Sequence, residues 1–307
     1  MRQALFRPPD TRSSPSPRPE TAGGRSIPAA VAGMLSWSGE RLDYATAKLA
    51  LDCLIDSSTD LEAAKQELER LTGNVRQLAA KTDNALAKLG AVRTVLYESG
   101  PWNGHRPFDY DHSDPLGTDI ANKLLANYLK TRRGNCVSMP VLFLILADRI
   151  GLDVSLATAP LHMFVRHRLK DGRIANLETT SGGYPVTIEQ LRQSFPMTDP
   201  ALANGLYLRS LGRHEAVAVM GHAVLEHLMA RRRFAEAAEL GHVLLRSGAR
   251  DVYAMVKCAS AYGAMVQSAL IDKPPGLLSP GSQRARRLFD DTNRLLFARA
   301  EALGWAE

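Results

Sequence analysis

The sequence predicts an α+β fold in which a small antiparallel sheet packs on one buried helix. Residues 137–150 are apolar on nearly all sides, which indicates a helix enclosed by the rest of the protein. Residues 153–179 then alternate with a period of two, and an Asp-Gly turn at Lys170-Asp171-Gly172-Arg173 divides them into a hairpin. Amphipathic patterns with a helical period precede and follow this core, so we expect helices to flank it.

The chain begins with a segment whose composition opposes folding. Residues 1–40 are rich in Pro, Ser, Arg and Gly, and they predict a disordered tail, either a tether or an over-extended start ahead of Met34. We therefore expect three parts: a disordered tail over 1–40, an α+β domain with an N-terminal helical segment over 41–200, and a helical region over 201–307.

Four amphipathic helices are expected ahead of the sheet. Their apolar residues recur at three- and four-residue spacings, and Asp60 stands at an N-cap position. The expected helices are 44–55, 61–71, 84–98 and 119–131. Between the third and fourth, residues 99–115 carry turn signals and an aromatic, acidic stretch that we interpret as a surface loop. Its two histidines, His105 and His112, lack the spacing of metal ligands, so we expect no metal.

The buried helix follows a turn that contains Gly134, Asn135 and Cys136. Pro140 is tolerated only in the first turn of a helix, which places the helix start close to Cys136. Backbone N–H groups and the helix dipole favour a thiolate at such a position. Gly151 is a suitable residue to end the helix.

The C-terminal part is predicted to be helical throughout. Helices are expected over 214–230, 234–247, 252–267 and 283–303, with a Pro/Gly/Ser linker over 273–282. The stretch 233–238 resembles the second helix of a tetratricopeptide repeat, and a plain helical bundle is the alternative.

Composition limits the classes of function. The net charge is +6, but five Arg and two acidic residues in the first 26 positions supply +3 of it, so the rest is only mildly basic. The clusters Arg231-Arg232-Arg233 and Arg284, Arg286, Arg287 are typical of solvated helix faces and do not favour nucleic-acid binding. No apolar run reaches the roughly 20 residues needed to cross a bilayer, so no membrane partner is expected. Three scattered cysteines form no CxxC pair, which favours a cytoplasmic protein.

Two further polar positions complete a candidate cysteine site. A cysteine nucleophile needs a base, and the base needs an orienting group. His162 opens the first strand of the hairpin, while Asn176 and Glu178 share one face of the returning strand. Strict pairing about Asp171-Gly172 sets residue 162 opposite about residue 181, so a shift of a few residues brings either candidate next to His162.

Four blocks of sequence together resemble the transglutaminase-like superfamily. They are Arg133-Gly134-Asn135-Cys136-Val137-Ser138, Leu146-Ala147-Asp148-Arg149-Ile150-Gly151-Leu152, Pro160-Leu161-His162-Met163-Phe164-Val165-Arg166 and Asn176-Leu177-Glu178-Thr179-Thr180-Ser181-Gly182-Gly183. The chain is most similar to bacterial transglutaminase-like proteins with N-terminal helices and C-terminal tetratricopeptide-type helices.

The resemblance implies a papain-like core with a cysteine nucleophile. Cys136 matches the nucleophile, His162 the general base, and Glu178 the position where the family has Asp. Asn176 is the alternative orienting residue, because papain-like enzymes also use Asn. No cofactor is implied.

The expected function is that of a cysteine enzyme that acts on peptide or Gln side-chain amides through a thioester, by hydrolysis or acyl transfer. Its partners would be a protein or peptide substrate and a protein bound on the C-terminal helices. The alternative is a non-catalytic interaction protein with a degenerate site.

Overall fold

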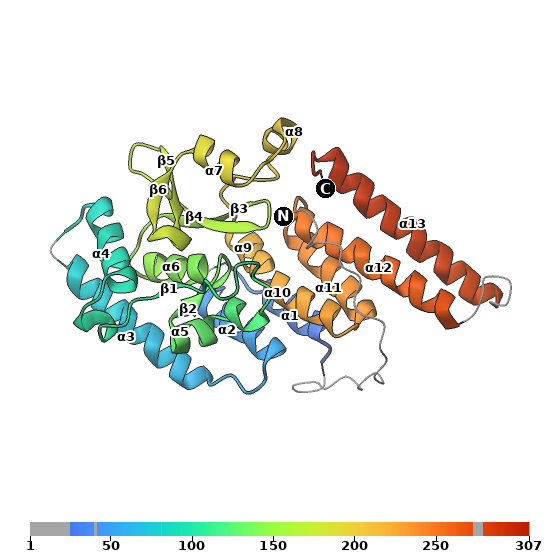
Figure 1. The fold of residues 1–307 in the computed structure, drawn as a ribbon, viewed down its shortest axis with the longest axis horizontal. Helices are drawn as coiled ribbons and strands as arrows, with labels where there is room; N and C mark the ends of the chain where they lie inside the picture. Colours follow the sequence, from blue (N-terminus) through green and yellow to red (C-terminus); the bar gives the residue numbers. More distant parts are fainter. Residues whose placement is uncertain (1–24, 40–41, 81, 273–278, 307) are drawn as a thin grey trace.

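A four-stranded antiparallel sheet lies across one long buried helix. A computed structural model describes residues 25–39, 42–80, 82–272 and 279–306 (Figure 1). The sheet has the order β3-β4-β5-β6. Its strands are β3 (Val154–Ala159), β4 (His162–Arg168), β5 (Ile174–Glu178) and β6 (Tyr184–Val186). The predicted α+β core is confirmed, and β6 adds a strand that the sequence did not predict.

Helix α6 (Ser138–Arg149) lies at the centre of the part of the molecule that carries the sheet. All its residues from Ser138 to Ala147 are buried. The sheet covers one side, and α3, α4 and α5 pack on the other (Figure 1). The helices before the sheet are α2 (Tyr44–Ile55), α3 (Leu61–Ala79), α4 (Ala85–Tyr97) and α5 (Leu125–Thr131).

The helix expected over 119–131 is two elements, a 3-10 turn at Ile120–Lys123 and α5. Buried side chains of α2 bond to the backbone at this break. The buried Lys48 ammonium donates to the Lys123 carbonyl at 2.9 Å, and Asp52 Oδ2 accepts the Ala126 N–H at 3.2 Å. These two groups satisfy backbone positions that a continuous helix would have bonded internally.

The prediction of a disordered tail over 1–40 is wrong for its last part. Residues 27–35 form helix α1 (Ile27–Leu35), which Ser26 caps by accepting the Ala29 N–H. Ile27, Val31 and Met34 are buried, and α1 packs against α11 (Phe234–Ser247). Burial of this apolar stripe outweighs the flanking composition. Residues 1–24 and 40–41 lie outside the described part.

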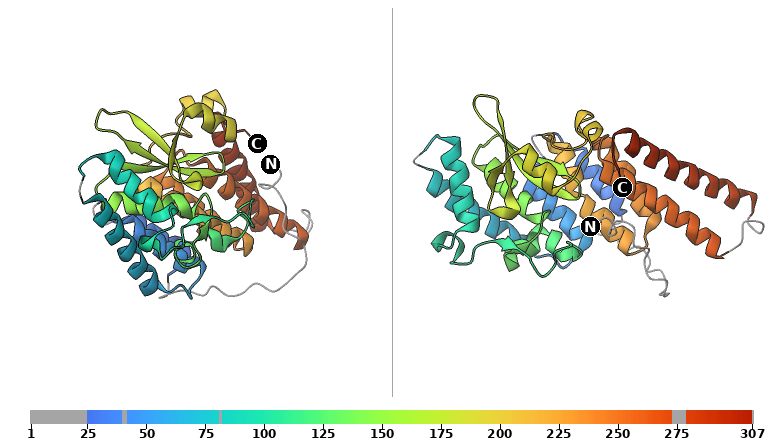
Figure 2. Two further views of the ribbon diagram at one scale, coloured as in Figure 1. Left: turned by 60° about the vertical axis from the view of Figure 1, so that its left-hand side comes forward. Right: turned by 45° about the horizontal axis from the view of Figure 1, so that its top comes forward.

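The C-terminal region is an array of helices that extends away from the sheet (Figure 2). After the short α7 (Ile188–Ser194) and α8 (Asp199–Ala203) come α9 (Arg213–Met220), α10 (His222–Ala230), α11, α12 (Val252–Asp272) and α13 (Pro280–Ala302). The helix expected over 214–230 is interrupted at Gly221, where a Cβ would lie 2.9 Å from Leu244 Cδ2. Close packing on α11 therefore requires glycine there.

The linker expected over 273–282 is partly corrected. Residues 273–278 lie outside the described part, and 280–282 already belong to α13, where Pro280 occupies a first-turn position.

One hydrophobic cluster runs through both halves of the chain. It includes Val31 of α1, Leu142 of α6 and Leu244 of α11 without a gap near residue 200. Arg213 and Asp148 reinforce this junction with an ion pair at 2.7 Å. Within the described ranges, no helix is both long and apolar enough to cross a membrane.

Candidate active site

The turn before α6 holds Cys136 in a half-buried position. Asn135 Oδ1 accepts the N–H groups of Val137 at 2.9 Å and Ser138 at 3.4 Å. Ser138 Oγ accepts the Asn135 N–H and donates to the Asn122 carbonyl at 2.7 Å. These bonds fix the turn from both ends, so the cysteine side chain has a defined direction.

Gly134 is needed where the chain enters this turn. A Cβ at this position would lie 2.4 Å from Ser138 Oγ and 2.6 Å from the Tyr128 ring. Residues 133–134 form β2 (Arg133–Gly134), which pairs in parallel with β1 (Asp109–Tyr110). The glycine thus lets the cysteine turn sit directly on α5.

His162 stands at the first position of β4, directly after a tight turn. Its strand partner is Ala159, so Pro160 and Leu161 form a two-residue loop between β3 and β4. The Leu161 carbonyl accepts the Cys136 thiol at 3.7 Å, a long contact that places the sulfur beside His162.

The imidazole of His162 is bonded to Glu178, as the hairpin predicts. Nε2 of His162 lies 2.7 Å from Oε2 of Glu178, and both side chains are buried. The other carboxylate oxygen accepts the Thr180 N–H at 2.9 Å and its hydroxyl at 2.6 Å. Nδ1 is the ring nitrogen that remains for the cysteine.

The register explains why a glutamate serves at this position. Val165 pairs with Leu177 and Arg168 with Ile174, so continuation of the ladder would set 162 opposite 180 rather than 178. Glu178 therefore reaches His162 diagonally, and an aspartate would be shorter by one C–C bond of ~1.5 Å.

The three side chains influence one another electrically. Burial lowers the pKa of His162, but hydrogen bonds and charge from Cys136 and Glu178 outweigh it and raise this pKa to about 9. Burial raises the pKa of Glu178, and the hydrogen bonds from His162 and Thr180, with the imidazolium charge, bring it below its usual value. At pH 7 the pair is therefore imidazolium and carboxylate.

Asn176, the alternative orienting residue, lies elsewhere on the strand. It pairs with Arg166 and Val186, and its buried Oδ1 has no hydrogen-bond partner among the described residues. The bond to the imidazole comes from Glu178 instead.

Three aromatic residues near the site were not found from the sequence. Phe195, at the end of α7, stacks on the His162 ring with centroids 4.1 Å apart. Burial raises the pKa values of Tyr110 and Tyr253. Charge on Cys136 adds to the rise at both, after the larger effect of Glu226 at Tyr253, so the two phenols lie within electrostatic range of the sulfur. Tyr253 belongs to α12 of the C-terminal helices. No local pattern marks contacts between residues so far apart in sequence.

The remaining candidates of the sequence lie apart from this site. The His112 ring lies against Tyr110 with the ring planes tilted by 50°, and His105 occupies a turn with φ of 58°. No group of three or more His, Cys, Asp or Glu side chains in the described ranges is arranged to hold a metal ion. Burial raises the pKa of the Cys53 thiol, and it raises that of Cys258 to about 12.

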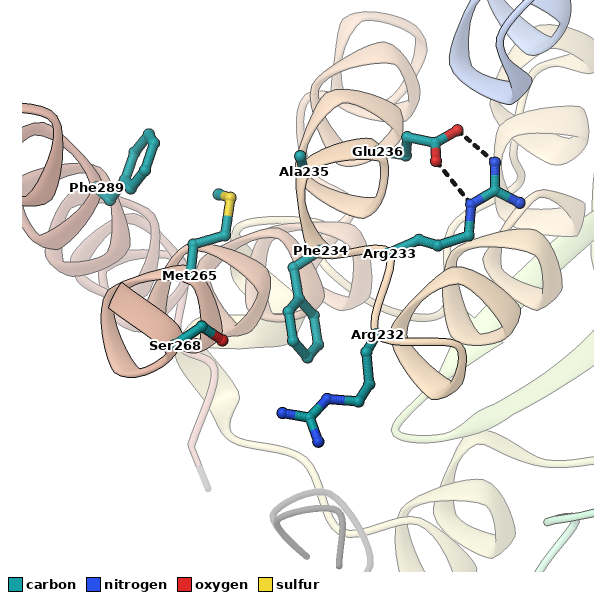
Figure 3. Close-up of a pocket in the computed structure, with 8 residues that line it drawn as sticks. All are labelled: Arg232, Arg233, Phe234, Ala235, Glu236, Met265, Ser268 and Phe289. Carbon is teal, nitrogen blue, oxygen red and sulfur yellow. Dashed lines mark hydrogen bonds and ion pairs between the residues drawn. The ribbon is translucent and has the colours of Figure 1, made fainter. Parts of the chain in front are cut away.

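A separate apolar cavity lies on the C-terminal helices. It measures about 430 Å³ and is walled by Phe234, Met265 and Phe289, with the Arg233–Glu236 ion pair at its edge (Figure 3). Cys136, His162 and Glu178 are not among the residues that line it.

Comparison with known proteins relates part of the chain to a described superfamily. Residues 62–203 match the family model of the transglutaminase-like superfamily. Two curated UPF0162 proteins of Xylella fastidiosa, from strains Temecula1 and 9a5c, are each 28% identical over 106 residues. That match spans about a third of each chain, 34% of this one and 34% of either relative. No solved structure matches. The chain thus carries a transglutaminase-like domain over 62–203.

Proposed function

We propose, from the transglutaminase-like domain, that this chain is a cysteine enzyme that acts on peptide or Gln side-chain amides. The observation that carries the proposal is the 2.7 Å bond between His162 and Glu178 on an imidazole whose second nitrogen remains for Cys136. We assign Cys136 as nucleophile, His162 as general acid and base, and Glu178 as the residue that orients the imidazole.

The proposed reaction has two halves. The Cys136 thiolate attacks the amide carbonyl, and His162 gives its proton to the departing amine as the C–N bond breaks. The product is a thioester on Cys136. Water or a second amine then attacks the thioester while His162 takes a proton from it, and the C–S bond breaks to restore the starting pair.

The backbone at Cys136 can support the charge that develops on oxygen. The N–H groups of Val137 and Ser138 bond to Asn135, whereas the Cys136 N–H makes no hydrogen bond within the described residues. We propose that this N–H binds the oxyanion of the tetrahedral intermediate.

Selective alkylation tests the proposal. At pH 7, Cys136 should react with iodoacetamide more than about tenfold faster than Cys53, because an imidazolium stabilises its thiolate. Mass spectrometry of digested protein measures all three cysteines at once, and Cys258 serves as the buried control. His162→Ala should reduce the rate at Cys136 to that of Cys53. Equal, slow labelling of all three would overturn the assignment.

The identity of the attacking group separates hydrolysis from acyl transfer. With a Gln-containing peptide and a fluorescent primary amine, transfer gives a labelled peptide, whereas hydrolysis gives a deamidated or cleaved one. Cys136→Ala is the control that should abolish either product.

A second candidate is a non-catalytic interaction protein. The apolar cavity among α11, α12 and α13 favours it, because its Phe and Met walls suit a protein side chain. We propose this surface, and the tetratricopeptide-like character of the region, only as the alternative. Binding partners retained by Phe289→Ala, but lost by Cys136→Ala, would count against it.

We also propose a cytoplasmic location, since all three cysteines are free.

A further inference from the structure

Two exposed leucines belong to the segments that border the cysteine turn, where solubility would favour polar residues. The Leu161 side chain is 56% exposed and that of Leu116 is 63% exposed. The carbonyl of Leu161 contacts the Cys136 thiol. Leu116 precedes Gly117, where a Cβ would be 3.5 Å from the side chain of Asn135, the residue next to Cys136.

Leu161 holds a backbone conformation that its residue type disfavours. Its φ is 56°, in the left-handed region where a Cβ costs energy and where glycine is usual. The residue is the second of the two-residue loop between β3 and β4, a position that glycine or asparagine would fill without strain. A strained, exposed, apolar residue beside a candidate nucleophile points to a role in binding.

Leu116 is presented by a loop that its own hydrogen bonds hold rigid. Asp114 accepts the N–H groups of Thr118 and Asp119, at 2.8 Å and 3.0 Å. The side-chain amide of Asn122 donates to Asp111 and Asp114. The backbone carbonyl of Asn122 accepts the Ser138 hydroxyl of the cysteine turn. The loop that carries Leu116 is therefore tied to the turn that carries Cys136.

We propose that Leu116 and Leu161 form an apolar rim that selects substrates with a large apolar side chain next to the reactive amide. This inference rests on the proposed function, since it names the substrate class of the same site. Burial of two exposed leucine side chains against a substrate side chain would supply the binding energy. Asp111 and Asp114 of the Leu116 loop are occupied in holding it, so Leu116 is what this loop offers to a ligand.

Two alkylating reagents that differ only in an apolar group measure how strongly the rim of Leu116 and Leu161 prefers an apolar ligand. The selectivity is the alkylation rate with N-benzyl iodoacetamide divided by the rate with iodoacetamide. We measure it at Cys136 and, for reference, at free N-acetylcysteine. Activation of the thiolate affects both rates equally, so the ratio does not depend on it. In the native protein this ratio should exceed that of N-acetylcysteine. Leu161→Ala and Leu116→Ala should each lower it by about three- to tenfold. Leu295→Ala, an equally exposed leucine on α13, is the matched control and should leave it unchanged.

The strain at Leu161 gives an independent readout. Leu161→Gly removes both the side chain and the left-handed penalty, so its melting temperature should rise by about 1–3 °C while the selectivity falls as in Leu161→Ala. Selectivity equal to that of N-acetylcysteine, unchanged ratios in both leucine variants, or a lower melting temperature for Leu161→Gly would overturn the proposal.

The proposed function fails on a different measurement. The absolute iodoacetamide rate at Cys136 reports activation of the thiol, whereas the ratio of the two reagents reports the rim. A slow Cys136 that keeps the apolar preference would overturn the enzyme and support the rim, and a fast Cys136 without the preference would do the reverse.

Discussion

Phe195 lies flat on the imidazole of His162, with the ring planes only 13° apart. The stack covers one face of a ring whose edge is already fixed by Glu178. Rotation of the imidazole about its bond to Cβ would break both contacts together. Phe195 is therefore a positioning residue, which sets the plane in which the ring nitrogens meet Cys136 and Glu178.

We expect Phe195→Ala to slow alkylation of Cys136 by roughly three- to tenfold, because loss of stacking of about 0.5–1.5 kcal/mol frees the ring. Iodoacetamide labelling at fixed pH measures the change, with Cys53 as internal control. Phe195→Tyr keeps the ring and should show the alkylation rate of the native protein. Phe195→Leu should recover the thermal stability lost in Phe195→Ala more fully than it recovers the alkylation rate. Equal rescue by Leu and Tyr would show that burial alone matters.

Glu178 and Asn176, the two candidates for the residue that orients His162, make different predictions. Glu178→Gln removes the negative charge, so the pKa of His162 should fall from about 9 towards its usual 6.5. The pH profile of Cys136 alkylation should move to lower pH. Asn176→Ala should leave the profile in place, because Asn176 does not bond to the imidazole. A shift in the Asn176 variant alone would reverse the assignment.

The raised pKa of His162 also predicts a pH-dependent stability. The folded protein binds this proton more tightly than the unfolded chain, so the contribution of His162 is complete below pH 6.5. It is lost as the pH rises through about 9. The difference in melting temperature between the native protein and His162→Gln should therefore be largest near pH 6 and shrink towards pH 10.

The buried pair of Lys48 and Asp52 should carry much of the stability of the first helices. Both side chains are fully buried, 2.6 Å apart, and each also bonds to backbone beside α5. Removal of one partner should lower the free energy of unfolding by about 3–5 kcal/mol, since the other charge is left unpaired. The double variant Lys48→Met/Asp52→Leu should cost much less than the sum. Urea unfolding measures all three.

The pair of Asp290 and Arg294 offers a matched control at the same i,i+4 spacing. It lies on α13 with its side chains 45% and 74% exposed. Asp290→Ala should cost less than about 0.5 kcal/mol. Similar losses at the two pairs would contradict the role given to burial.

The parts of the fold that the sequence predicted are those encoded by neighbouring residues. The apolar run of α6 and the Asp-Gly hairpin are local signals, and the hairpin brings His162 near Glu178 through strand pairing alone. Asn176 and Glu178 lie on one face two residues apart, so which of them reaches the imidazole depended on the exact strand register, which a sequence leaves open.

Other features depended on contacts between distant segments. Strand β6 is three residues long, contains Pro185 and is mostly exposed, so no alternation marks it. Helix α1 is ordered by α11, some 200 residues later, and its short apolar run alone did not reveal that partner. Phe195 and Tyr253 likewise acquire their place only when α7 and α12 fold against the core.

The continuity of the core has a practical consequence for how this protein is handled. A fragment limited to the matched residues 62–203 would lack α2 and with it the Lys48 ammonium that bonds to Lys123, as well as α12 with Tyr253. Its faces towards α2, α9 and α10 would meet water, and aggregation is the expected result. Limited proteolysis should accordingly leave the junction between residues 62–203 and the helices that follow them uncut.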